Sequence, residues 1–303
     1  MTDIDISNLT ELSCSEIKET ELRLLLDFCT FCREEGLRCY LAYGTLIGAV
    51  RHGGFIPWDD DIDLMMPRPD YERLATLGDR LKARFGRLSV ILPGSARSRH
   101  TFLKIIDETT VKIEQNISVP TPPLGIDIDI FPLDAAPADS AEDCHKIKRR
   151  LDFLYSEHTL RCLIRLRGTW KRRLVSILRV FLPSRRRLIR RAERLLGVRH
   201  LDFGSSARVV SYSSLYNSAR NIYDRAWFDG VTELSFENHS VPVPIGYDAV
   251  LRTMFGDYMQ LPPEEQRVTH HSNKCYLKSP LTDADACSPL SRDDAATDGK
   301  ENL

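Results

Sequence analysis

Two short segments of alternating aspartate and aliphatic residues constrain the fold of this 303-residue chain more than any other feature. The first reads DIDL over residues 61–64, and the second reads GIDIDIFP over residues 125–132. Alternate side chains of a β-strand point to opposite faces, so each segment predicts a strand whose aliphatic face packs into the core. The other face of each strand would then carry two carboxylates: Asp61 with Asp63, and Asp127 with Asp129.

Carboxylates this close repel each other unless a cation lies between them. Because oxygen ligands alone select hard ions, we expect Mg²⁺ or Mn²⁺ at Asp61 and Asp63, with Asp127 or Asp129 completing the site. A second interpretation is that residues 59–63 form a solvated acidic turn, the usual fate of a charge run. The neighbouring Trp58 and the interleaved aliphatic residues argue against it, because such side chains favour a buried face.

A calcium loop is a further alternative, because Asp59, Asp61 and Asp63 match the first three ligand positions of an EF-hand. Leu64 stands where that loop needs glycine, and Asp70 stands where it needs a bidentate glutamate. The sequence therefore disfavours an EF-hand.

The elements around these segments alternate between helix and strand. A capping box at Ser13–Glu16 predicts a helix that ends at Gly36. A strand over Arg38–Tyr43 follows, and Gly44 and Thr45 separate it from a short helical turn. A helix is expected over Pro69–Phe85, then strands at residues 88–92, 102–106 and 110–115. The chain therefore belongs to the α/β (α+β) class.

Local charge is more informative than the formal net charge of −1. Between Arg161 and Arg199 there are fourteen Lys or Arg residues and one acid, Glu193. We interpret residues 140–200 as a basic helical insertion in a domain over residues 14–278, and residues 279–303 as a disordered acidic tail. Apolar residues from Trp170 to Phe181 fall at helical spacing, which fits either a helix packed on its own domain or one lying on an anionic membrane. No module that reads nucleic acid accompanies the arginines, so none is expected as a partner.

The compartment follows from what the sequence lacks. The N-terminus has no positive flank or apolar stretch of a secretory signal, and no apolar run is long enough to span a bilayer. The eight cysteines are scattered, which fits reduced thiols, and the close pair Cys29 and Cys32 has no second pair at zinc-ligand spacing. We expect a cytoplasmic protein with peripheral contact at the inner face of the membrane.

The run YGTLIGAVRHGGFIPWDDDIDL over residues 43–64 resembles the signature of the LicD-type phosphotransferases, which include the fukutin-related branch. Three later segments are similar to the same family: residues 104–107 (KIID), 128–134 (IDIFPLD) and 258–264 (YMQLPPE). The resemblance extends from about residue 20 to residue 275, except for residues 145–205, which carry no motif of the family.

The resemblance implies a nucleotidyltransferase-like mixed sheet flanked by helices. It also implies transfer of phosphocholine, or a similar phospho-alcohol, from a CDP-linked donor such as CDP-choline to a glycan or lipid-linked glycan hydroxyl of lipopolysaccharide, capsule or teichoic acid. One alternative on the same fold is transfer of the nucleotide itself to a small-molecule or sugar hydroxyl. A different class of function is a non-catalytic binding scaffold, but none of the matched carboxylates is missing.

Roles follow from combining the motif with phosphoryl-transfer chemistry, in which a protein mainly positions groups and neutralises charge. Asp61 and Asp63 are expected to bind Mg²⁺, and the motif places the third carboxylate at Asp129, as a metal ligand or as the base for the acceptor hydroxyl. Asp127 is the second choice for this role. Asp59 and Asp60 are expected to support the site.

The remaining expectations concern the donor. Backbone N–H groups near Gly44, Thr45 and Gly48 would face donor phosphate at a helix start. Arg51 and Lys104 would offset phosphate charge or form ordinary salt bridges, and His52 would contact phosphate or base or have no role. If the donor carries choline, Tyr43 and Trp58 are candidate aromatic faces for its ammonium, although both could be core residues. Asp134 is expected to cap a helix.

Overall fold

A computed structural model of the chain describes residues 8–95, 97–98, 100–114, 123–136, 142–144, 146–150, 202–212, 221–269 and 273–278. Most of the predicted basic insertion and the whole predicted acidic tail lie outside these residues, as does the amphipathic segment from Trp170 to Phe181. The statements below concern the described ranges.

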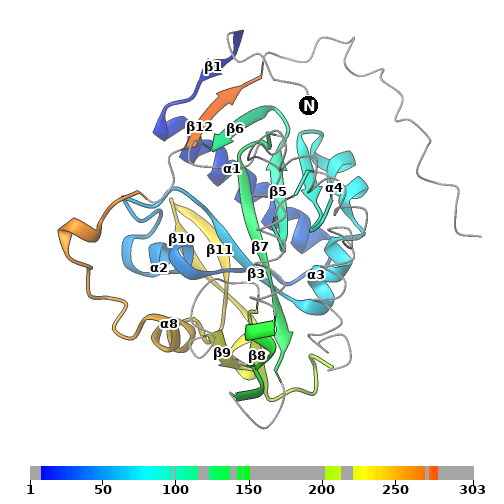
Figure 1. The fold of residues 1–303 in the computed structure, drawn as a ribbon, viewed down its shortest axis with the longest axis vertical. Coiled ribbons are helices and arrows are strands. Elements are labelled where there is room, and N and C mark those ends of the chain that lie inside the picture. Colours follow the sequence, from blue (N-terminus) through cyan, green and yellow to red (C-terminus); the bar gives the residue numbers. More distant parts are fainter. Residues whose placement is uncertain are drawn as a thin grey trace, which may run out of the picture.

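The centre of the fold is a mixed sheet in the order β2-β3-β7-β5-β4 (Figure 1). Its strands are β2 (Tyr40–Leu41), β3 (Asp63–Pro67), β7 (Asp127–Ala135), β5 (Leu103–Asp107) and β4 (Leu88–Ile91). β3 and β7 are parallel, whereas the other neighbours along this order are antiparallel. The predicted α/β class and mixed sheet are therefore confirmed.

Two short strands and two small sheets complete the β structure. β8 (Arg208–Val210) pairs with the end of β7, and β9 (Ile222–Asp224) pairs with β8. A separate antiparallel sheet joins β1 (Thr10–Glu11), β12 (Asn273–Leu277) and β6 (Thr110–Glu114) in that order. The hairpin of β10 (Val231–Phe236) and β11 (His239–Pro244) turns at Glu237 and Asn238, which both have positive φ, as the tight turns favoured in hairpins require.

The first helix matches its sequence signals closely. α1 (Cys14–Glu34) begins with the predicted capping box, in which Ser13 and Glu16 cap each other reciprocally. Gly36 adopts a φ of +63°, and the next amide, of Leu37, donates to the carbonyl of Cys32, so the helix ends where the glycine predicted. α1 contacts β5 and β7 and lies across one side of the central sheet in Figure 1.

The predicted helix over residues 69–85 is two helices, α3 (Arg68–Leu74) and α4 (Gly78–Phe85). The amides of Thr76 and Leu77 bond three residues back, which tightens and ends the first helix. The break lets Leu74 and Leu81 both be fully buried. Apolar spacing alone could not locate this break.

Other helices border the sheet. α2 (Tyr43–His52) follows β2, and α8 (Tyr247–Phe255) contacts α2 and a 3₁₀ turn, η4 (Arg225–Phe228). A second 3₁₀ turn, η5 (Glu264–Gln266), lies in the segment before β12. Within the part of the chain that the structure describes, no helix is long and apolar enough to cross a membrane.

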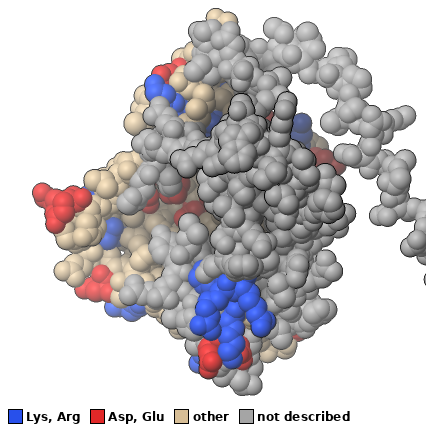
Figure 2. All heavy atoms as spheres, in the orientation of Figure 1, with Lys and Arg blue, Asp and Glu red and all other residues tan. Residues whose placement is uncertain are grey.

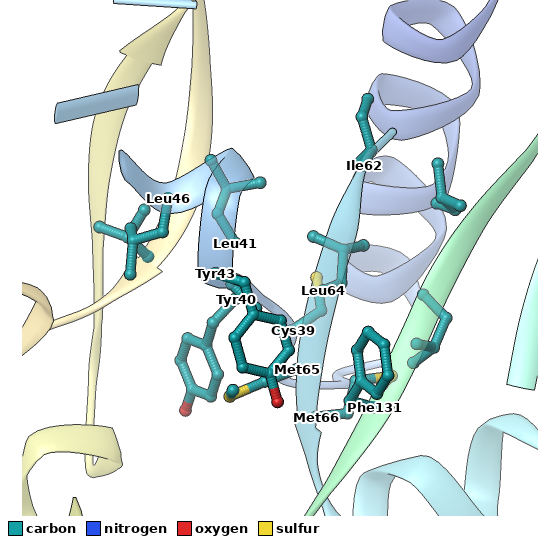
Figure 3. Packing of buried hydrophobic residues seen from close by; sticks show 14 of the residues in the cluster. Cys39, Tyr40, Leu41, Tyr43, Leu46, Ile62, Leu64, Met65, Met66 and Phe131 are labelled. Carbon is teal, nitrogen blue, oxygen red and sulfur yellow. The ribbon is translucent and has the colours of Figure 1, made fainter. Parts of the chain in front are cut away.

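The core surrounds β3 and β7. Ile62 and Leu64 are fully buried, as are Ile128 and Ile130 of β7, so the aliphatic positions of both alternating segments face the interior as predicted. Figure 3 shows Ile62, Leu64 and Met66 along β3 with Phe131 of β7 beside them. This packing fixes the orientation of both strands, and the aspartates on alternate positions are fixed with them.

Candidate functional site

One row of side chains crosses the middle of the central sheet. In the register of the strands, Asp63 of β3 lies opposite Asp129 of β7, and Asp129 lies opposite Lys104 of β5. Residues paired in register share a face, so Asp63, Asp129 and Lys104 stand side by side. The structure thus brings together two of the predicted carboxylates and one of the predicted cations, which are separated by up to 66 positions in the chain.

Asp61 is not part of this row, because β3 begins at Asp63 rather than at Asp61. The prediction that Asp61 and Asp63 share one face of a strand is therefore wrong. Residues 59–62 form the loop that enters β3, and ligand oxygens of Asp59, Asp60 and Asp61 lie within 4.8 Å of one another. The charge on Asp61 still acts on Asp63, so the loop and the strand belong to one acidic site.

The acidic loop at Asp59–Asp61 is partly exposed. Figure 2 shows small areas of Asp and Glu near the middle of the drawn face. Asp59, Asp60 and Asp61 are all half-buried, so they are neither fully solvated nor sealed in the core. This intermediate exposure argues against the solvated acidic turn.

The start of α2 holds the acidic segment in place. The hydroxyl of Thr45 accepts a hydrogen bond of 2.9 Å from the backbone N–H of Asp63, and the amide of Ala42 donates to the carbonyl of Asp63. A Cβ added to Gly44 would lie 2.5 Å from Oδ2 of Asp59, so only glycine lets that carboxylate approach the helix. Thr45 and Gly44 therefore position Asp63 and Asp59 directly.

Gly48 has a different role from the one that the sequence suggested. It lies in the second turn of α2, where an amide is used inside the helix, whereas the free N–H groups of a helix are those of its first residues. A Cβ at Gly48 would lie 2.4 Å from the carbonyl oxygen of Gly54. Close packing against the following loop explains this glycine.

Like charges and burial perturb the acidic residues. Burial, together with Asp61 and Asp60, raises the pKa of Asp59 to about 7. Burial raises the pKa of Asp63 well above its ordinary value, and the charges of Asp61, Asp129 and Asp59 add to the effect while Lys104 opposes it. Such mutual repulsion is what a bound cation would relieve.

Lys104 is buried and forms ion pairs with two carboxylates of β7. Its Nζ lies 2.5 Å from Oδ1 of Asp129 and also contacts Asp127, which in turn is 2.8 Å from Nζ of Lys112 on β6. Burial acts to raise the pKa of Asp127, but the two ammonium groups hold it well below its usual value. For Asp129, burial is the larger effect and the pKa rises to about 6 despite Lys104.

Two residues of this network were not predicted from the sequence. Lys112 is half-buried beneath Asp127, and Glu21 of α1 is buried with one carboxylate oxygen, Oε2, lacking a hydrogen-bond partner among the described atoms. Burial raises the pKa of Glu21 well above its usual value, against the opposing charge of Lys112. Glu21 lies four positions after Ile17 and three before Leu24, on the apolar stripe of its helix, and a charged residue there was a usable signal.

Arg51 and His52 lie at the end of α2. The Arg51 guanidinium donates to the carbonyl of Tyr258 at 2.8 Å and to that of Gln260 at 3.4 Å, which ties α2 to the segment after α8. The His52 ring meets the ring of Trp58 edge-on, at 6.1 Å between centroids. Burial and the neighbouring Arg51 lower the pKa of His52, which favours a neutral imidazole.

The remaining candidates, Tyr43, Trp58 and Asp134, differ in burial and in contacts. Tyr43 is buried against Phe131, with its hydroxyl 3.0 Å from Oγ of Ser211, so it presents no open face to a ligand. Trp58 is half-buried, and the Arg267 guanidinium lies 5.6 Å over its ring. Asp134 does not cap a helix, because it is buried within β7 and binds Arg68 through both carboxylate oxygens.

The donor set fits a hard divalent cation. The three clustered carboxylates of Asp59, Asp60 and Asp61 offer only oxygen, and Asp63 and Asp129 lie next in line. Burial and the neighbouring carboxylates both raise the pKa values of Asp59 and Asp63, and a cation between these groups would favour their charged forms. Lys104, by contrast, already neutralises part of the charge at Asp129.

The mixed sheet places carboxylates of the adjacent parallel strands β3 and β7 beside the start of α2. Residues 36–167 match the family model described as LicD/FKTN/FKRP, nucleotidyltransferase domain. The predicted resemblance to the LicD family is thereby confirmed for this part of the chain.

Two curated relatives are similar to the chain. Lipopolysaccharide cholinephosphotransferase LicD of Haemophilus influenzae is 28% identical over 274 residues, which cover 89% of this chain and 100% of the relative. Mannosyltransferase regulator 4 of Saccharomyces cerevisiae is 32% identical over 95 residues, which are 31% of this chain and 7% of the relative. The first similarity extends over nearly the whole chain, so it includes both the loop at Asp59–Asp61 and the strands of the site.

Proposed function

We propose that the protein transfers phosphocholine, or a similar phospho-alcohol, from a CDP-linked donor to a hydroxyl of a cell-surface glycan and releases CMP. The observation that carries the proposal is the row of Asp63, Asp129 and Lys104 beside the carboxylates of Asp59–Asp61. The similarity to a cholinephosphotransferase that acts on lipopolysaccharide supports the choice of donor and acceptor.

In the proposed reaction, the acceptor oxygen forms a bond to the phosphorus that bears the alcohol, and the bond from that phosphorus to CMP breaks. The proton of the acceptor hydroxyl passes to a carboxylate. Asp129 suits this role, because a base is most effective when its pKa lies near the working pH, and burial raises its pKa to about 6. Lys104 holds one oxygen of Asp129 and so fixes the direction of the other.

Asp61 and Asp63 are the proposed ligands of Mg²⁺ or Mn²⁺, with Asp129 adjacent and with Asp59 and Asp60 reinforcing the negative potential. When bound, the cation would neutralise charge on the donor diphosphate and on the departing CMP. Thr45 and Gly44 contribute by holding Asp63 and Asp59 at the start of α2. The N–H groups of the first turn of α2 are suited to an anionic oxygen of the donor.

Arg51 and His52 remain candidates for contact with the donor, and Trp58 for contact with a choline ammonium. Arg51 uses Nη1 to bind two carbonyls, so its contribution to phosphate binding would depend on its remaining donors. The Arg267 guanidinium covers one face of the Trp58 ring. A choline ammonium would approach either this face or the opposite face of the ring.

A panel of CDP-linked alcohols tests the proposal. Purified protein is incubated with Mg²⁺, a glycan acceptor and each donor in turn, and the nucleotide product is identified. Release of CMP with a modified glycan supports phospho-alcohol transfer, and EDTA should abolish it. Release of pyrophosphate from a nucleoside triphosphate would instead indicate nucleotidyl transfer, and no turnover with any donor would favour a binding scaffold.

We also propose peripheral contact of the protein with an anionic membrane at the inner face, where a lipid-linked acceptor would be met. The support is the basic composition of residues 140–200. Their described part, residues 142–144 and 146–150, carries Lys146, Lys148, Arg149 and Arg150, of which Lys146 pairs with Glu142 and Asp143. Co-sedimentation at low salt should favour anionic over neutral vesicles, and equal recovery from both would exclude this contact.

A further inference from the structure

Lys104 occupies an unusual position for a lysine beside a proposed metal site. Its side chain is buried, and its ammonium lies between the carboxylates of Asp127 and Asp129 rather than extending toward a ligand. Both carboxylates come from β7, and Lys104 comes from the adjacent β5, directly opposite Asp129 in register. The strand pairing therefore fixes the ammonium in place.

The charges of this network balance without any added ion. Lys104 and Lys112 carry two positive charges, and Asp127 and Asp129 carry two negative charges when ionised. Burial raises the pKa of Glu21, the nearby buried carboxyl, well above its usual value. Both ammonium groups thus contact carboxylates of β7, and the cluster of Asp59, Asp60 and Asp61 is a separate group of carboxylates.

Many phosphoryl-transfer sites bind two divalent ions about 3.5–4 Å apart, which both contact carboxylates shared between them. In this chain Lys104 already supplies a positive charge at Asp129, because its ammonium lies 2.5 Å from Oδ1 of that carboxylate. A second divalent ion would have to displace a buried lysine that is held by two carboxylates, which is costly.

We propose that Lys104 takes the place of a second metal ion, so that the site binds one divalent cation, at Asp59–Asp63. Asp127 is a positioning residue, because its carboxylate holds the ammonium of Lys104 beside Asp129. This inference rests on the proposed function only in taking the acidic loop as the metal site.

The direct test is a count of bound ions on the full chain. After EDTA treatment, Mn²⁺ is titrated against the protein, and bound and free ions are separated by equilibrium dialysis, with and without CDP. We expect one ion per chain in both cases. Two ions per chain, in either case, would overturn the role of Lys104 while leaving a metal-dependent transferase intact. No bound ion would overturn the metal site of the proposed function as well.

Two matched substitutions sharpen the count. Lys104→Met removes the ammonium from Asp129, and the exposed charge should recruit a second Mn²⁺, so the count rises from one to two. Lys112→Met is the control, because it removes the other lysine of Asp127 without touching Asp129, and its count should stay at one. A folded Lys104→Met protein that binds one ion would contradict the inference. If circular dichroism shows that this variant is unfolded, the wild-type count decides.

Discussion

The acidic loop at Asp59–Asp61 and the buried strand pair β5–β7 differ in the charged groups that surround their carboxylates. In the loop, half-buried carboxylates cluster together, and burial together with repulsion from Asp61 raises the pKa of Asp59. On the strands, Asp127 is more deeply buried, yet two lysines hold its pKa below the usual value. The difference teaches that Asp127 is balanced by ion pairs within the chain, whereas the loop carboxylates are clustered with one another, as expected of the proposed cation site.

The largest effect is expected at Asp63, next to the acidic loop at Asp59–Asp61. Asp63→Asn should lower the transfer rate by about 10³-fold, equivalent to about 4 kcal/mol, because it removes a charge that the metal requires. Initial rates of CMP release measure the loss. Asp79→Asn, at an exposed position in the first turn of α4, is the control and should retain activity. Wild-type rates in Asp63→Asn would remove Asp63 from the site.

The same comparison predicts opposite stability changes. Asp127→Asn leaves the buried Lys104 and the half-buried Lys112 with one carboxylate fewer, and we expect it to lower the free energy of unfolding by about 3–5 kcal/mol. Asp63→Asn relieves repulsion and should raise that free energy in EDTA. Urea unfolding of both variants without metal measures these changes. Equal destabilisation of the two proteins would mean that the two regions do not differ in charge compensation.

Stability should also depend on pH through Asp59. Its pKa is about 7 in the folded protein and about 3.9 when unfolded, so the folded state holds the proton more tightly. The resulting stability is fully present below about pH 4 and is lost as the pH rises to about 7, by about 1–2 kcal/mol after allowance for solvent screening. Thermal unfolding in EDTA between pH 5 and 8 should show a weaker decline in Asp59→Asn. An unchanged slope would contradict the raised pKa.

The smallest effect concerns the link between α2 and β3. Thr45→Val removes the hydroxyl that accepts from the Asp63 amide, and should cost about 1 kcal/mol of stability. Thr45→Ser keeps that hydroxyl and is the matched control. If the hydrogen bond positions Asp63 for metal, Thr45→Val should also weaken Mn²⁺ binding while Thr45→Ser does not. Equal affinities in both variants would limit Thr45 to a structural role.

Much of the site was accessible from the sequence because its signals are local. Alternation placed Asp127 and Asp129 on one face and the isoleucines in the core, and both features are present in β7. The family motif singled out Asp63, Asp129 and Lys104, which the sheet register brings together. Their catalytic and metal-binding roles remain predictions.

The errors have a common origin in local patterns. Asp61 was assigned to a strand because alternation starts there, yet pairing with β7 starts at Asp63, and a strand exists only where a partner supplies hydrogen bonds. Asp134 was assigned to a helix cap because Pro132 precedes it, but the strand continues through that proline to Ala135. In both cases the strand pairing that decides the structure involves residues far away in the sequence.

The sequence by itself determined the class of fold, the ends of α1, the resemblance to the LicD family and the candidate carboxylates. Periodicity, caps and motifs depend on neighbours within a few positions, so a single chain carries them in full. Only the tertiary structure decided that Lys104 and Lys112 neutralise Asp127, that Glu21 lies behind them, and that Arg51 binds the carbonyls of Tyr258 and Gln260. These contacts join residues from 15 to 209 positions apart, and strand order and register set them rather than local preference.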